Sequence, residues 1–138
     1  MSQQSLWGEL PASSETKSPI AILREQATAL RDATNGMLTG DVSATASDMR
    51  FTASLYVVAP ALNNYRYEVL TVQHPVAFYP VAIRSRAVLR PLEAKNEEEF
   101  LGHLEKILTS RKIHSVIASL ISMSTSSGGS FVDEEGGE

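Results

Sequence analysis

The sequence predicts an α+β protein with an N-terminal helix, a four-stranded antiparallel meander sheet and two C-terminal helices packed on one sheet face. Three observations support this. Aromatic and β-branched residues concentrate in successive strand-like runs over residues 50–83, the flanking segments show helical spacing, and short loops between consecutive strands favour an antiparallel order. We expect one domain, residues 18–123, between a disordered N-terminal arm (1–17) and a disordered acidic Ser/Gly-rich tail (124–138).

The first helix has signals at both of its ends. Ser18 can accept from free N–H groups, and Pro19 suits the first helical turn, where its missing N–H costs nothing. Asn35 and Gly36 favour the left-handed conformation that ends a helix. The apolar stripe between these ends comprises Ile20, Leu23, Ala27 and Leu30.

Four strands follow, recognised by side chains that alternate between two faces. The expected strands are residues 37–46, 50–59, 65–74 and 78–89. The third is apolar on both faces, which is typical of a central strand or of one covered on both sides. Pro80 lies near the start of the fourth, which favours an edge strand or a bulge.

The C-terminal region predicts two helices rather than one. Asn96 and Glu99 have the spacing of a capping box at the first helix start. From Leu108 to Ile113, at about 100° per residue, the apolar stripe rotates by roughly 140°. One straight helix cannot bury both stripes on a single surface, so we expect a break there, with Ser110 capping a separate last helix.

Composition and charge exclude several classes of protein. The chain has no Cys, which rules out disulfides, thiol nucleophiles and Cys-ligated metal centres. It shows no secretory signal and no apolar run long enough to span a membrane, so we expect a soluble, cytoplasmic protein with no membrane partner. The net charge is −4, but residues 50–90 carry five Arg against Glu68 and are basic, whereas both flanks are acidic. Overall acidity argues against indiscriminate nucleic-acid binding.

Sequence motifs point to no catalytic or metal chemistry. Glu99 and His103 lie one helical turn apart and could share a metal, but one such pair is a weak signal and a surface ion pair is the ordinary explanation. His74, before Pro75, is expected to be structural, and His114 to be solvated. Nucleophile elbows and phosphate-binding loops are missing. We therefore expect no catalytic residues, no metal and no cofactor, and we favour a non-enzymatic role over an enzymatic one.

A basic strip is the main candidate for partner binding. Arg84, Arg86 and Arg90 share strand parity, so three guanidinium groups would line one side of the fourth strand and could grip phosphate or carboxylates. The alternative is an edge strand that its charge protects from aggregation. The strip could also hold the acidic tail residues 133–135. The candidate partner-binding set is Arg66, Arg84, Arg86, Arg90, Tyr56 and Tyr67.

Three functions fit these observations, of which a non-enzymatic protein-interaction module of adaptor, chaperone-like or toxin-neutralising type comes first. It would bind a protein partner through a sheet face or the basic edge, with a homodimer possible. The second is a small-molecule-binding domain or minor enzyme with a pocket between sheet and helices, for which Tyr56, Tyr67, His74 and Arg66 are the polar groups. Strand alternation, however, separates Tyr67 from Arg66 and His74. RNA binding through the Arg-bearing strand is the third.

Trp7 stands apart from these schemes. It is the single Trp of the chain and lies in the polar N-terminal arm. Such a residue can dock onto the domain or a partner, or can remain exposed.

Overall fold

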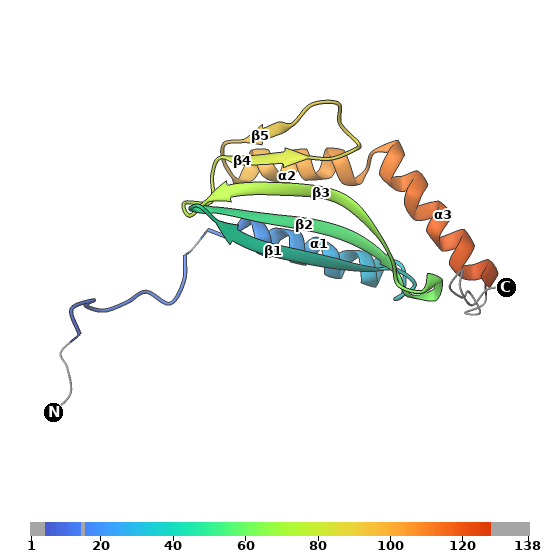
Figure 1. Ribbon diagram of the computed structural model, residues 1–138, viewed down its shortest axis with the longest axis horizontal. Coiled ribbons are helices and arrows are strands. Elements are labelled where there is room, and N and C mark those ends of the chain that lie inside the picture. Colours follow the sequence, from blue (N-terminus) through green and yellow to red (C-terminus); the bar gives the residue numbers. More distant parts are fainter. Residues whose placement is uncertain (1–4, 15, 128–138) are drawn as a thin grey trace.

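A computed structural model describes residues 5–14 and 16–127 of the 138-residue chain. It confirms the α+β class, with helices packed on an antiparallel sheet that has five strands rather than four (Figure 1). The elements in order are α1 (Pro19–Ala33), β1 (Thr39–Ser47), β2 (Arg50–Ala59), the 3-10 turn η1 (Pro60–Leu62), β3 (Tyr65–Pro75), β4 (Val81–Arg84), β5 (Leu92–Ala94), α2 (Glu97–Leu108) and α3 (Arg111–Ser127).

The sheet is a meander in which each strand pairs antiparallel with the next, in the order β1-β2-β3-β4-β5. Alternation along β2 separates its two faces: Ala53, Leu55 and Val57 are buried, whereas Ser54 and Tyr56 between them are half-buried. The helices cover the face that carries Leu55, which we call the covered face. The opposite face, rich in Ser and Thr, is called the open face.

The predicted signals at the ends of α1 are confirmed. The Ser18 hydroxyl accepts from the Ala21 N–H at 3.1 Å. At the other end Asn35 and Gly36 have φ values of 53° and 81°. The Gly36 N–H donates to the Arg31 carbonyl at 2.8 Å, which satisfies a carbonyl of the last turn.

Gly40 on β1 lets α1 lie directly against the sheet. A Cβ placed on Gly40 would be 2.5 Å from the Ala27 Cα atom, which is too close for any side chain. The pairing of a glycine with a small alanine therefore fixes how closely helix and sheet approach.

A β-bulge at Val69 changes the faces of β3. Leu55 of β2 pairs with Leu70, but the next residue, Tyr56, pairs with Glu68, so that Val69 is the extra residue. The bulge explains why apolar residues appear to occupy both faces of the strand in the sequence. It also corrects the expected alternation, because Tyr67 and His74 both fall on the covered face.

The expected fourth strand, residues 78–89, is wrong in its second half. Strand β4 ends at Arg84, and a short fifth strand, β5, follows after a turn. The Ser85 hydroxyl donates to the Val69 carbonyl at 2.7 Å and accepts from the Ala87 N–H at 3.1 Å. The Ser85 side chain thereby takes the place of a backbone hydrogen-bond partner for β3 and starts a turn, which ends β4.

The two C-terminal helices begin where the sequence predicts. Asn96 caps α2 by accepting from the Glu99 N–H at 2.9 Å, and the Glu99 carboxylate accepts in return from the Lys95 N–H. Ser110 caps α3, accepting from the Ile113 N–H at 3.3 Å. Helix α3 continues to Ser127, beyond the expected end, and it runs at a steep angle to α2 (Figure 1).

No helix in the described part of the chain is both long and apolar enough to cross a membrane.

Candidate functional site

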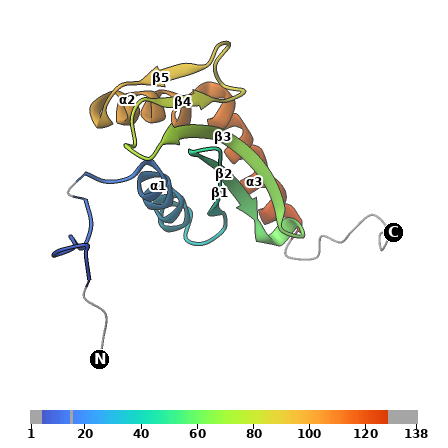
Figure 2. The ribbon, with the colours of Figure 1, turned by 60° about the vertical axis from the view of Figure 1, so that its left-hand side comes forward.

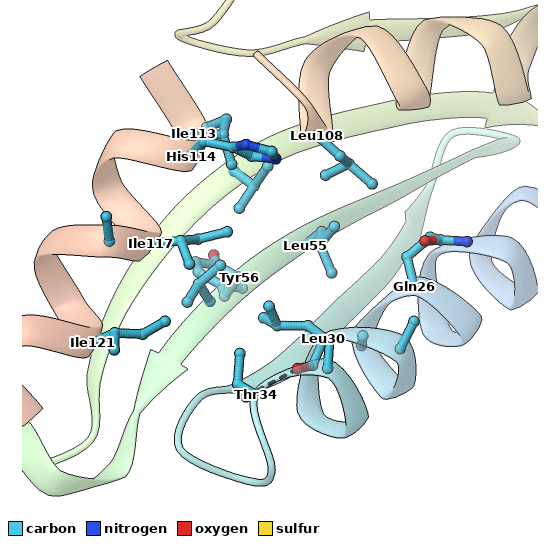
Figure 3. Close-up of a pocket in the computed structure, with 16 residues that line it drawn as sticks. Gln26, Leu30, Thr34, Leu55, Tyr56, Leu108, Ile113, His114, Ile117 and Ile121 are labelled. Atoms are coloured by element: carbon cyan, nitrogen blue, oxygen red, sulfur yellow. Dashed lines mark hydrogen bonds between the residues drawn. The ribbon is translucent and has the colours of Figure 1, made fainter. Parts of the chain in front are cut away.

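An apolar groove lies between α1 and α3, above the covered face of β2 (Figure 3). Its cavity volume is about 480 Å³. Leu55, Val57 and Val69 form the floor, and α1 and α3 form the walls, with Leu108 of α2 at one end. We call this cavity the α1–α3 groove.

The wall residues of the groove explain why it stays open. Helix α1 contributes small residues, Ala27, Ala29 and Ala33, with Leu30 pointing inward. The facing side of α3 carries large residues. They are Ile113, Ile117 and Ile121. Because α3 turns away from α2 at Ser110 and the facing alanines are short, the two walls do not fill the space between them.

Few polar side chains line the α1–α3 groove. Those of Gln26, Thr34, Tyr56 and His114 border it. The Thr34 hydroxyl is already engaged, because it lies 3.0 Å from the Leu30 carbonyl and accepts from the Leu38 N–H at 3.1 Å. The site therefore offers apolar contact area rather than an array of hydrogen-bonding groups.

A second apolar depression flanks α3 on its other side. It has a volume of about 470 Å³ and is bordered by η1, β3 and α3. Its apolar side chains are Leu62, Tyr65, Tyr67, Val116, Leu120 and Met123. Helix α3 thus has apolar hollows along both of its flanks, of which the α1–α3 groove has the larger number of aliphatic residues.

Two of the predicted binding residues, Tyr56 and Arg66, lie together on the open face. The Arg66 guanidinium is 4.1 Å from the centre of the Tyr56 ring. It also forms a 2.9 Å ion pair with Asp41, and both side chains are about half exposed. Arg66 is thus largely neutralised by its neighbour. Tyr56 borders the groove from β2, but its ring packs under Arg66 on the other face.

The predicted row of three arginines along one strand is not formed. Arg84 lies on the open face, opposite Thr71, but the strand ends there. Arg86 follows the strand and is 5.8 Å from the ring centre of Tyr67, which faces the other way. Arg90 lies in the loop before β5. The prediction that the three arginines share one side of a strand was wrong, because β4 ends before Ser85. A binding role for each arginine alone stays a prediction.

The histidines do not converge on a reactive centre. His74 is buried, stacked on Phe51 with ring centres 5.6 Å apart, and its Nδ1 lies 2.7 Å from the Pro75 carbonyl. Its Nε2 meets no hydrogen-bond partner among the described residues. His103 Nε2 lies 3.1 Å from the Glu93 carbonyl, so this ring nitrogen is engaged away from Glu99.

The described residues hold no group of three or more His, Cys, Asp or Glu that is placed to bind a metal ion. The acidic residues 133–135, expected to contact the arginines, lie outside the described part of the chain.

Tyr79 packs against the core and has a raised pKa. Its hydroxyl is buried and has no hydrogen-bond partner in the described structure, and its ring packs against Phe100. Burial raises the pKa of Tyr79, and the Glu97 carboxylate adds to the rise. The residue lies under α2, away from the α1–α3 groove, and we assign it a packing role.

Comparison with known proteins adds no family to this geometry. No family model, curated protein or solved structure matches the chain.

The sequence allowed for a pocket between sheet and helices, but of the polar groups named for it, Tyr56, Tyr67, His74 and Arg66, only Tyr56 borders the α1–α3 groove. Two features of the sequence could have located the groove. One is the rotation of the apolar stripe between Leu108 and Ile113, which makes the last helix diverge. The other is the run of alanines in α1, at Ala27, Ala29 and Ala33, since a helix face of small residues opposite isoleucines leaves space.

Proposed function

We propose that this protein is a non-enzymatic protein-interaction module that binds an apolar segment of a protein partner in the α1–α3 groove. The groove itself is the observation that supports this: an apolar concave surface of about 480 Å³ between two helices. A partner helix or strand would bury its apolar side chains there, each worth about 1.5–3 kcal/mol when fully buried.

The open face of the sheet is a weaker candidate for partner binding than the groove. On that face Arg66 is paired with Asp41, and Arg84 stands without the two arginines expected beside it. An isolated, half-exposed ion pair contributes little binding energy. The geometry required by the RNA alternative, three arginines along one strand, is also missing from the described strands.

A small apolar molecule is the second candidate occupant. The volume of the groove falls within the range of roughly 300–1,000 Å³ that is usual for ligand sites. Such sites use a small number of precisely placed polar groups to fix the orientation of the ligand. The groove has four polar side chains among the described residues, those of Gln26, Thr34, Tyr56 and His114. Of these, the Thr34 hydroxyl is already hydrogen-bonded within the chain, and the Tyr56 ring packs under Arg66 on the open face. We therefore rank an apolar protein segment above a small molecule.

The test selects peptides from a displayed random library with the full-length chain as bait. We expect enriched peptides to carry apolar residues at helical or alternating spacing. Two variants locate their site: Ala29→Glu puts a charge at an exposed position that lines the groove, and Thr28→Glu puts the same charge one residue away, at an exposed position outside it. Ala29→Glu should weaken binding at least about tenfold, or roughly 1.4 kcal/mol, and Thr28→Glu should not.

Two results would contradict the proposal. Peptides that bind both variants equally well would place the site elsewhere. A fatty acid that binds in an Ala29→Glu-sensitive manner, with no peptide enriched, would support the small-molecule alternative instead.

A further inference from the structure

The N-terminal arm, residues 5–17, exposes three large apolar side chains within a stretch of five residues. Leu6 is 96% exposed, Trp7 78% and Leu10 64%. The burial of such side chains is favourable, and Trp offers the largest area of any residue type. A cluster of this kind on an extended arm has the composition of a short docking motif.

The course of the arm directs it away from its own groove. In two views the arm leaves the N-terminal end of α1 and extends away from α3 (Figures 1 and 2). Trp7 is eleven residues from Ser18, and a fully extended chain rises by about 3.3 Å per residue, so that the arm can place Trp7 at most about 35 Å from the domain. That reach is enough to meet the groove of an adjacent molecule.

We infer that Leu6, Trp7 and Leu10 of one molecule dock into the α1–α3 groove of a second copy of this chain. The inference rests on the proposed function, since it requires the groove to accept an apolar segment, and it names the partner. The motif is apolar, as are the floor and both walls of the groove.

Opposite charges also lie in the arm and beside one end of the groove. Glu9 stands between Trp7 and Leu10 in the motif. No acidic side chain borders the groove among the described residues, and α3 begins with Arg111 and Lys112, immediately before the lining residue Ile113. These cations lie at the positive end of the helix dipole, where an anion stabilises the helix. The Glu9 carboxylate would be such an anion.

Two copies can satisfy both grooves at once. If each molecule inserts its arm into the other, the pair closes with twofold symmetry and leaves no groove empty. The second arm then binds at the high effective concentration set by the first contact, which makes the pair tighter than a single arm in a single groove.

The fluorescence of Trp7 measures this docking directly, because Trp7 is the single Trp of the chain. The emission of Trp7 is measured with the full-length protein between about 1 μM and about 1 mM, a range that covers weak association. Docking in a second copy predicts a blue shift and several-fold weaker quenching by acrylamide as concentration rises, together with dimer formation by light scattering. Ala29→Glu should abolish these changes, and Thr28→Glu should keep them.

A mixing experiment separates docking between molecules from docking within one. Trp7→Ala removes the fluorophore but leaves the groove, whereas Ala29→Glu blocks the groove but leaves the arm. When the Trp7→Ala protein is added to the Ala29→Glu protein, the emission of Trp7 should shift to the blue. Addition of a double variant with both changes should leave it unchanged. Circular dichroism of each variant checks that it is folded.

Several outcomes would overturn the inference. Trp7 emission that is blue-shifted at every dilution, in a protein that light scattering shows to be a monomer, would show docking within one molecule. Emission typical of water at every concentration would show no docking. The inference would also be wrong if the emission of Trp7 did not shift when the Trp7→Ala protein is added to the Ala29→Glu protein. If selected peptides nevertheless bind Trp7→Ala and are lost in Ala29→Glu, the groove keeps its proposed function and the arm proposal fails alone.

Discussion

At the scale of single residues, Gly40 determines how closely α1 approaches the sheet. Gly40→Ala places a Cβ 2.5 Å from the Ala27 Cα atom, and because the obstacle is backbone, the whole helix must shift. We expect a loss of about 1–3 kcal/mol in the free energy of unfolding, measured by urea denaturation. Gly102→Ala in α2 is the control, since nothing lies within 4 Å of the added atom. It should stabilise by about 0.5–1 kcal/mol. Equal stability of Gly40→Ala and wild type would contradict the close contact.

Tyr79 should lower the stability of the protein as the pH becomes alkaline. Burial raises its pKa in the folded state above the ordinary value of 10.0. As the pH rises past that value, the unfolded chain releases the phenol proton first, so the folded state binds more protons and the free energy of unfolding falls.

We therefore expect Tyr79→Phe to flatten this alkaline decline. Below pH 10 the variant should match or slightly exceed wild type in stability, because it removes a buried hydroxyl that has no partner in the described structure. Urea denaturation over a pH series measures both effects. Parallel curves for the two proteins would show that Tyr79 does not contribute to the pH dependence.

At the scale of elements, the β1–β2 hairpin contains a strained turn. Asp48 and Met49 form the two-residue turn, with φ values of 52° and 65°. Turns of this kind favour glycine at the second position, because a residue with a Cβ pays roughly 1–2 kcal/mol in the left-handed region. Met49 is exposed, so its side chain contributes little packing in return.

Met49→Gly should therefore raise the free energy of unfolding by about 1 kcal/mol. Met49→Ala is the matched control, because it removes the long side chain but keeps the Cβ atom and hence the strain. Thermal and urea unfolding compare the two variants. If both variants have the same stability, the backbone of Met49 is not strained in the way the hairpin indicates.

Local signals in the sequence were sufficient for most elements. The bounds of β2, the caps Ser18 and Asn96, and the break at Ser110 were predicted because each depends on residues adjacent in the chain. The bulge at Val69 could not be predicted, since it depends on how β3 pairs with β2. The end of β4 also depends on a distant contact, the hydrogen bond from Ser85 to the Val69 carbonyl.

At the scale of the whole molecule, the candidate site follows from how helices diverge over a sheet. No single stretch of sequence contains the groove, because its floor comes from β2 and β3, and its walls come from α1 and α3. Three of the six predicted binding residues, by contrast, were chosen along one strand. The end of β4 then separated these three, with Arg84 on the open face, Arg86 near Tyr67 and Arg90 in the loop before β5.

The central claim is that the α1–α3 groove, and not the open face of the sheet, receives a partner segment. The most direct test follows backbone amide chemical shifts of the isotope-labelled, full-length protein as a selected apolar peptide is added. The account predicts changes that centre on Ala29, Leu30, Ile117 and Ile121, with Arg84 unaffected. Changes that centre on the open face around Arg84, with the groove amides unmoved, would contradict it.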